Sequence, residues 1–298
     1  MRKNILAWII VLILVAGGVY YRDQAESAGV NNSSRVVISL GQDLSQSQQQ
    51  EVISYFSKNG TTTDARYITV SNAEERQYLK GVVDESVIGT RAISSAYVEI
   101  MESGQGINVK THNITWVTPF MYANALTTAG IKDALVVVAA PFEVSGTAGL
   151  TGIIKAFETA SGKKISENAK QTANQEVAET SKLGQKIGKD KAETFIYEVK
   201  RQVIEKKTSD PQEIRRIIVD VSGKLNIKLT TDEIDRITAL MQKINQLNIN
   251  LGRVNEQLKT WRQDIEKVKG NTREAVGIVQ QILNFLRSLI DRIAAVVS

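Results

Sequence analysis

The sequence of 298 residues contains no cysteine and only one histidine. The absence of cysteine excludes disulfides, thiolate metal sites, cysteine nucleophiles and a lipoprotein anchor. A single histidine, His112, excludes zinc sites that need several histidines. No cluster of Lys and Arg is interleaved with aromatic residues, and the net charge is only +5, so nucleic acid is not an expected partner. We expect neither a bound metal nor a cofactor.

The N-terminus has the pattern of an export segment. A basic tripeptide precedes a nearly continuous apolar stretch from Ile5 to Tyr21, as in a secretion signal or a signal anchor. Residues 22–34 read as a polar tether. Cleavage stays open: the small residues at 16–18 suit a cleavage site, whereas Tyr20–Tyr21 suit a membrane interface. We expect an uncleaved membrane anchor, with the remaining chain extracytoplasmic.

Residues 35–162 are expected to form an α/β domain. The hydrophobic content of 42% is enough for a real core. Strand and helix patterns alternate as β-α-β-α-β-β-α-β, which predicts a mixed sheet of about five strands with crossover helices and a parallel first pair. Thr90–Met101 and Ile107–Val117 are strand-like and are joined by a short glycine-containing segment, which indicates a hairpin. Asn72 is the expected N-cap of a short helix.

The most distinctive stretch is Ile131–Gly152. Leu135–Ala140 is continuously apolar and predicts a strand covered on both faces. We expect this strand to end at Pro141, because proline cannot donate to a ladder. Helical spacing starts near Leu150. Between strand and helix lie three glycines and three hydroxyl residues, namely Ser145, Gly146, Thr147, Gly149, Thr151 and Gly152.

A glycine-rich turn at a helix N-terminus can bind an anion, but this turn matches no specific fingerprint. No lysine follows Gly152, which excludes a Walker A loop. The glycines are spaced three and three, which does not fit a dinucleotide loop. Glu143 stands where a nucleophile elbow requires glycine. The favoured interpretation is that the glycines permit a tight corner and close helix–sheet packing; a ligand site at Ser145–Gly152 is the alternative.

Few other side chains suggest chemistry. His112 lies among hydroxyl and amide residues and is more simply a structural hydrogen-bonding residue than a catalytic or ligand-binding one. Glu74–Glu75 and Asp84–Glu85 are possible carboxylate pairs for acid–base work, although adjacent acids more often form a solvated face. We therefore name no catalytic residue.

From residue 163 onward the pattern is helical. Residues 163–229 predict a helical extension, with one helix opening at Asp210-Pro211. Thr230–Glu233 is a capping box. It starts a helix with apolar residues spaced alternately three and four apart, as in a coiled coil. The seam consists of Ile237, Leu240, Ile244, Leu247, Leu251, Val254, Leu258, Trp261, Ile265 and Val268.

A second apolar stripe, from Val276 to Val297, follows a break at 269–272. The two helices predict an antiparallel hairpin over residues 230–298. Residues 237–297 also offer a surface for homo-oligomerisation. Alternatively, the arginines flanking the last stripe would suit a membrane surface.

Four runs carry a family resemblance: GTRAISSA at Gly89–Ala96, THNITWV at Thr111–Val117, TAGIKDA at Thr128–Ala134 and APFEVSGTAGLTGIIKAFETASGKKISE at Ala140–Glu167. They resemble the YpuA-like family of exported Gram-positive bacterial proteins, which share a domain of unknown function. The resemblance covers roughly Val36 to Leu258. It implies an extracytoplasmic, envelope-associated protein and supplies no catalytic residues.

Two functions fit the sequence. The first is a non-enzymatic envelope protein, secreted or anchored, that binds a wall, lipid or protein partner; the export pattern and the lack of a complete catalytic constellation favour it. The second is an enzyme, or an anion- or nucleotide-binding domain, that uses the glycine loop at 145–152.

Overall fold

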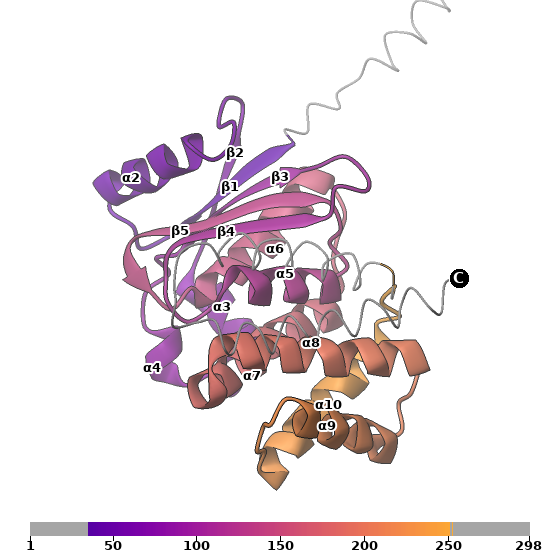
Figure 1. The fold of residues 1–298 in the computed structure, drawn as a ribbon. Helices are drawn as coiled ribbons and strands as arrows, with labels where there is room; N and C mark the ends of the chain where they lie inside the picture. The colour runs from indigo at the N-terminus through magenta and orange to yellow at the C-terminus, as the bar shows by residue number, and fades with distance from the viewer. Residues whose placement is uncertain (1–34, 251, 253–298) are drawn as a thin grey trace, which may run out of the picture. The chain divides into compact units, whose positions relative to one another are not determined.

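The structure is a computed structural model and describes residues 35–250 and 252. Its sheet has the strand order β2-β1-β3-β5-β4 (Figure 1). The strands are β1 Val36–Gly41, β2 Arg66–Val70, β3 Ser95–Ile100, β4 Ile107–Ile114 and β5 Ala134–Val144. The pairs β1–β2 and β4–β5 are parallel, whereas β1–β3 and β3–β5 are antiparallel. The predicted mixed five-stranded sheet and its parallel first pair are confirmed.

The predicted hairpin between the third and fourth strands is wrong. β5 lies between β3 and β4, so that Val137 pairs with Tyr97 on one side and with Lys110 on the other. The connecting segment is held against the start of β5, because the amides of Gly104 and Gly106 both donate to Asp133 Oδ1 at 2.9 Å. β5 takes the inner position because it is apolar on both faces, whereas β4 exposes alternate residues.

The expected end of the central strand at Pro141 is also wrong, since β5 continues to Val144. Pairing with β3 stops at Ala139. No residue of β3 therefore pairs with Pro141, and its missing N–H does not interrupt that ladder. On the other side β4 has an irregularity at Asn113, which has a φ of 58° and whose side-chain amide donates to Ala140 O at 2.9 Å. The strand therefore continues past Pro141 at a point where the ladder is irregular.

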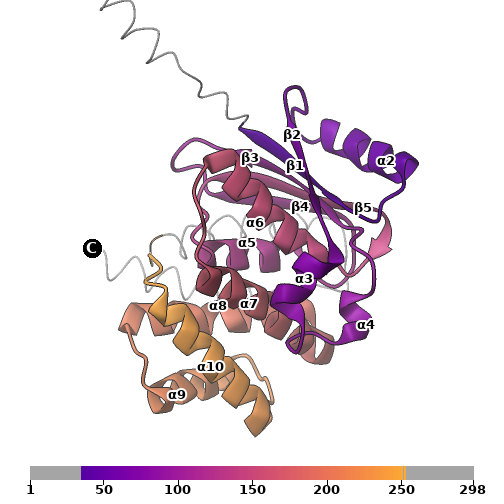
Figure 2. The same cartoon turned by 180° about the vertical axis from the view of Figure 1, so that it is seen from behind.

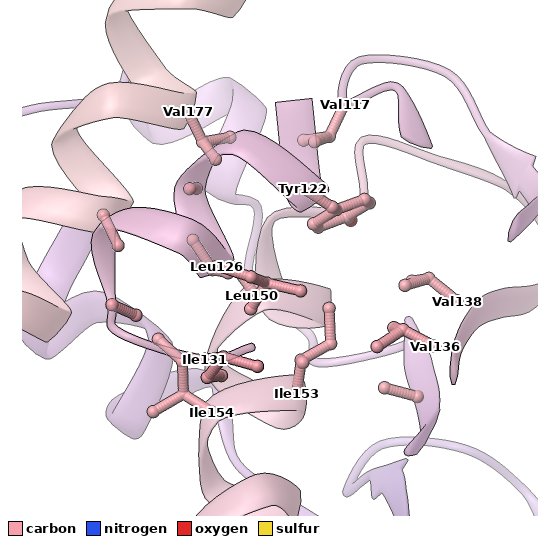
Figure 3. Close-up of a cluster of buried hydrophobic side chains, with 14 of the residues drawn as sticks. Val117, Tyr122, Leu126, Ile131, Val136, Val138, Leu150, Ile153, Ile154 and Val177 are labelled. Atoms are coloured by element: carbon pink, nitrogen blue, oxygen red, sulfur yellow. The ribbon is translucent and has the colours of Figure 1, made fainter. Parts of the chain in front are cut away.

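Helices cover both faces of the sheet, as Figures 1 and 2 show. α2 (Gln46–Ser57) packs on the face that carries Val137 and Ala139. α5 (Pro119–Thr128) and α6 (Thr147–Ser161) pack on the opposite face. There Leu126 of α5 and Leu150 and Ile153 of α6 gather with Val136 and Val138 of β5 (Figure 3). The two-sided burial predicted for this strand is confirmed.

Two short helices lie beside this core. α3 spans Asn72–Leu79, and its N-cap is Ser71, one residue before the predicted Asn72. Ser71 forms a capping box with Glu74, which supplies two hydrogen bonds where Asn72 would supply one. α4 spans Glu85–Ile88. α6 begins at Thr147, three residues earlier than its apolar spacing indicated, because Gly146 adopts a φ of 93° and turns the chain directly into the helix.

The helical region follows the predicted order. Its helices are α7 Glu167–Ile187, α8 Lys189–Lys206, α9 Pro211–Lys224 and α10 Thr231–Gln246. Asp210 caps α9, and the Thr230–Glu233 capping box starts α10, both as predicted. The four helices share a second apolar core that includes Phe195, Ile214 and Leu240.

The predicted seam does not continue as one helix. α10 ends at Gln246, and Asn248 has a φ of 51°. Ile237, Leu240 and Ile244, the first seam positions, are buried by the neighbouring helices of the bundle. The seam beyond residue 252, the stripe at 276–297 and the N-terminal segment lie outside the described residues. In the part of the chain that is described, no helix is long and apolar enough to cross a membrane.

Candidate functional site

The glycine loop divides into a packing part and a surface part. Gly149 and Gly152 belong to the packing part. A Cβ atom on Gly149 would lie 2.6 Å from Tyr122 Oη and 2.8 Å from Val138 Cγ1, and one on Gly152 would lie 2.8 Å from Ser39 Oγ. Tyr122 and Val138 both belong to the core of Figure 3. These two glycines therefore permit close helix–sheet contact, which was the favoured interpretation.

Two further candidate residues, Thr151 in α6 and His112 in β4, do not belong to the surface part of the loop. Thr151 is 5% exposed in α6, and its Oγ1 has no hydrogen-bond partner among the described residues. His112 stacks on Tyr55 of α2, with ring centroids 4.2 Å apart. Neither residue lines the cleft at the start of α6.

Ser145, Gly146 and Thr147 line an open cleft of about 480 Å³ at the start of α6. The other walls are α4 with the segment that follows it, the end of β5, and Trp116 after β4. The corner is rigid: the Tyr122 hydroxyl donates to Gly146 O at 2.5 Å, and the amide of Trp116 donates to Ser145 O at 3.2 Å. A volume of this size falls within the range of small-molecule sites, about 300–1,000 Å³.

The segment 89–94 forms the opposite wall and is fixed by hydrogen bonds from two directions. Asp43 Oδ2 accepts from the Ala92 amide at 2.7 Å. The Arg76 guanidinium donates to Gly89 O at 2.6 Å. Gly89 has a φ of 71°, which starts the turn. The wall is therefore part of the folded scaffold.

Glu75 of α3 is among the residues that line the cleft. The residue is 0% exposed; its Oε2 accepts from Asn72 Nδ2 at 3.3 Å, but its Oε1 has no hydrogen-bond partner in the described part of the chain. Burial raises the pKa of Glu75 to about 7, and the Thr147 hydroxyl and the Asn72 amide oppose that shift. A buried carboxyl with a partnerless oxygen is uncommon in a folded protein and calls for an explanation.

The proposed carboxylate pairs are not brought together as pairs. Glu74 forms the α3 capping box and an ion pair with Lys155 at 2.5 Å. Burial alone would raise the pKa of Glu74, but its hydrogen bonds with Lys155 and Ser71 lower it below the usual value. Asp84 is the N-cap residue of α4, and Glu85 pairs with Arg76. Only Glu75 of these four acids lines the cleft.

Two aromatic residues that the sequence analysis did not select also line the cleft. Trp116 is 8% exposed, and its Nε1 lacks a hydrogen-bond partner within residues 35–250 and 252. Phe142 is 39% exposed. The charged residues Arg91 and Glu143 also line the cleft. Arg91 and Trp116 belong to the runs Gly89–Ala96 and Thr111–Val117, so the resemblance was the available signal for them.

A second buried charged cluster lies between α5, α7 and α8. Lys200 Nζ is 3.0 Å from Glu176 Oε1, 2.8 Å from Asn124 Oδ1 and 2.7 Å from Thr128 Oγ1. Asn124 and Thr128 also donate to the Glu176 carboxylate. Since its members satisfy one another, this cluster is structural. Within the described residues no group of three or more His, Asp or Glu side chains could hold a metal ion.

The fold is thus an α/β domain with a helical extension and a cleft at the start of α6. The model of a family described as "Protein of unknown function (DUF1002)" matches residues 40–261. The uncharacterized protein YpuA of Bacillus subtilis is 40% identical over 262 residues, which cover 88% of this chain and 89% of that protein. The chain therefore belongs to the DUF1002 family, and the YpuA-like resemblance is confirmed. No solved structure matches it significantly.

Proposed function

We propose that this protein is an exported, envelope-associated binding protein that holds a small ligand in the cleft between segments 86–94 and 142–148. One observation carries the proposal: Glu75 Oε1 is buried and partnerless beside an open cavity. An unsatisfied buried acceptor costs about 1–3 kcal/mol. Because Oε1 has almost no accessible surface, a ligand would contact the exposed lining around it and act on this carboxyl through neighbouring side chains such as Thr147.

The raised pKa of Glu75, which follows from the same burial, fits a binding role. Carboxyls with strongly raised pKa values in clefts are concentrated at functional sites. The walls support the same role, because both loops are fixed by hydrogen bonds before any ligand arrives. A preformed site loses little conformational entropy when it binds.

Export rests on the sequence. The basic tripeptide and the apolar stretch Ile5–Tyr21 favour an extracytoplasmic location, and the family resemblance points the same way. The test is protease treatment of protoplasts that express the full chain with a C-terminal tag. We expect loss of the tag without lysis and retention of the chain in the membrane fraction. A tag that is cut only after lysis would contradict export.

Ligand binding is tested by hydrogen–deuterium exchange of the full chain in detergent, with and without a soluble digest of the host cell wall. We expect slower exchange in segments 86–94 and 142–148. Ser86→Tyr places a ring in the cleft and should abolish the protection. The matched control is Gln50→Tyr on exposed α2, which should retain it. Unchanged exchange in both segments would contradict a ligand cleft.

An anion- or nucleotide-binding function is the second candidate. It is favoured by α6, whose N-terminus receives no side-chain cap from the described residues. It is disfavoured by Glu75, because any ionised fraction of that carboxyl repels an anion. Inorganic phosphate and ATP are the probes. A rise in melting temperature that disappears in Ser86→Tyr would favour this candidate over a neutral ligand.

A further inference from the structure

The two ends of the sheet differ in charge. β1, β2, β4 and β5 begin at one end, where β3 also ends, and the cleft lies at the other. We call the first end the tether end, because residues 22–34 join the domain there at Arg35. We propose that the tether end binds the surface of an anionic lipid bilayer and that the cleft thereby faces away from the membrane. This inference rests on the export and membrane retention included in the proposed function.

Several connections come together at the tether end. The Ile100 amide donates to Arg35 O at 2.9 Å, and the Met101 amide donates to Asp133 O at 3.0 Å. The start of β1, the connection from α2 to β2 and the C-terminal end of α6 lie at this same end in Figure 2. Side chains from separate stretches of the sequence therefore share one surface.

Exposed cations outnumber exposed acids at the tether end. The exposed acids are Asp64 and Glu102. Glu99 and Asp133 are half-buried and already accept hydrogen bonds, Glu99 from the Tyr97 hydroxyl at 2.7 Å and Asp133 from two glycine amides. The exposed cations are Arg35, Lys58, Arg66, Lys132, Lys163 and Lys164.

Ion pairs do not neutralise these cations. Of the six, only Lys164 forms an ion pair with a described residue; its Nζ is 3.9 Å from Glu158 Oε2, and its side chain is 90% exposed. Glu158 lies closer to Lys170, at 3.1 Å. The positive charge of the tether end is therefore available to an external anionic partner.

The cleft end has the opposite balance. Its exposed acids are Asp43, Asp84, Glu85 and Glu143, and its exposed cations are Lys80 and Arg91. The two ends are separated by the length of a six-residue strand, about 20 Å, which exceeds the screening length of about 8 Å at physiological salt. An anionic surface therefore attracts one end and does not attract the other, which favours a single orientation.

An exposed aromatic residue favours a lipid surface over a soluble polyanion. Tyr67 follows Arg66 on the edge strand β2 and is 48% exposed. Tyrosine is enriched at membrane–water interfaces, where its ring meets the apolar layer and its hydroxyl meets water. A soluble polyanion offers the charge but not the apolar layer.

The sequence that precedes the domain brings a membrane within reach. Residues 22–34 are thirteen residues long and span at most about 45 Å. With Ile5–Tyr21 in the membrane, as the proposed function has it, the domain stays close to the bilayer at a high effective concentration. Weak attraction at several basic residues is then enough to orient it.

The test uses a fluorescent donor on the domain and an acceptor in the membrane. Because the chain contains no cysteine, Ser103→Cys at the tether end and Gln42→Cys at the cleft end each supply one labelling site, and both positions are exposed. The labelled full chain is reconstituted in phosphatidylcholine nanodiscs that contain a rhodamine lipid, with or without about 30% phosphatidylglycerol. With the anionic lipid, we expect energy transfer from the Ser103 label to rise and transfer from the Gln42 label to fall. About 0.5 M NaCl should remove both changes.

Charge removal tests which residues are responsible. One basic residue near an anionic surface changes the ratio of docked to undocked molecules about fivefold. Lys163→Gln combined with Lys164→Gln should therefore lower that ratio at least about tenfold, and both positions are exposed, so the variant should fold. The matched control is Lys224→Gln combined with Lys228→Gln. These two lysines are exposed and lie at and just after the end of α9, far from the tether end in Figures 1 and 2, so the ratio should not change.

The outcomes separate this inference from the proposed function. Equal energy transfer in neutral and anionic nanodiscs would overturn the inference, while export, tested on protoplasts, would be unaffected. A control variant that lowers the ratio as much as the tether-end variant would show a response to net charge alone and would also overturn it. A tag that is cut only after lysis of protoplasts contradicts the proposed export, whatever the nanodiscs show.

Discussion

Lys200 Nζ lies 3.0 Å from Glu176 Oε1, and the two side chains are 0% and 1% exposed. Burial lowers the pKa of Lys200, and the charge and hydrogen bond of Glu176 oppose that shift. Lys200 belongs to α8, Glu176 to α7, and their partners Asn124 and Thr128 to α5. Through Asn124 and Thr128, this ion pair therefore joins α7 and α8 to α5, which packs on the sheet.

Lys200→Met should destabilise the fold by about 3–5 kcal/mol, because it leaves the Glu176 carboxylate buried without its cation. Lys200→Met combined with Glu176→Gln should recover a large part of that loss, since no charge then remains buried. Urea denaturation followed by circular dichroism measures Lys200→Met, Glu176→Gln and the double variant. A double variant as unstable as the two single losses added together would show that the two residues act independently.

Glu193→Gln should stabilise the protein at alkaline pH. Glu193 is 3% exposed and accepts a hydrogen bond from the Thr118 hydroxyl; burial raises its pKa to about 8. The native carboxyl therefore keeps its proton between pH 4.5 and 8, whereas the unfolded one loses it, so the free energy of unfolding falls as pH rises through this window. Glutamine keeps an acceptor for Thr118 and has no proton to lose.

We expect the variant to match the parent protein at pH 5 and to exceed it by about 2–4 kcal/mol at pH 9. Thermal or urea denaturation at pH 5, 7 and 9 measures this difference. Glu51→Gln, at an exposed position of α2, is the control and should show no such trend. A difference that does not change with pH would contradict the assignment of the raised pKa to Glu193.

Gly149→Ala should lower stability by about 1–3 kcal/mol, the usual cost of overpacking. The added methyl group would lie within 3 Å of both Tyr122 Oη and Val138 Cγ1, and Tyr122 is itself held by its bond to Gly146 O. Gly223→Ala in α9 is the control. A Cβ there has no described atom within 4 Å, so the helix should gain about 0.5–1 kcal/mol. Equal effects at the two glycines would mean that the close packing of α6 is not as described.

Asp133→Ala should release the segment between β3 and β4. The carboxylate accepts from Gly104 and Gly106, and hydrogen bonds to a charged acceptor contribute about 1.5–3 kcal/mol. We expect the exchange of these two amides to accelerate at least about tenfold in hydrogen–deuterium exchange. Asp84→Ala is the control, because the Asp84 side chain forms no capping hydrogen bond with the described residues. Unchanged exchange at 102–106 would contradict the proposed role of Asp133.

Local signals in the sequence predicted the helices well. Asp210 and Thr230 mark helix starts because a cap satisfies backbone groups within the next few residues and needs no distant partner. The run Leu135–Ala140 predicted an inner strand for a similar reason, since its apolar side chains need cover on both faces wherever it lies.

Strand order could not be predicted in the same way. The segment between β3 and β4 is short, which favours a hairpin locally, but β5 pairs with two strands by inserting between them.

The prediction of one continuous helix through the coiled-coil seam was wrong for a related reason. Ile237, Leu240 and Ile244 have coiled-coil spacing, yet they are buried in a core that residues far earlier in the chain share, from Phe120 of α5 onward.

For the candidate site, the sequence alone identified Ser145, Gly146 and Thr147 and excluded cysteine and multi-histidine chemistry. It also indicated export, which stays a prediction. Only the tertiary structure decided which of the two adjacent acids lines the cleft. Glu74 and Glu75 are adjacent, but successive side chains on a helix point about 100° apart, so Glu74 meets Lys155 near the surface and Glu75 is buried in the lining of the cleft. What lies in each direction depends on β5, α6 and the segment 86–94, which only the folded chain brings together.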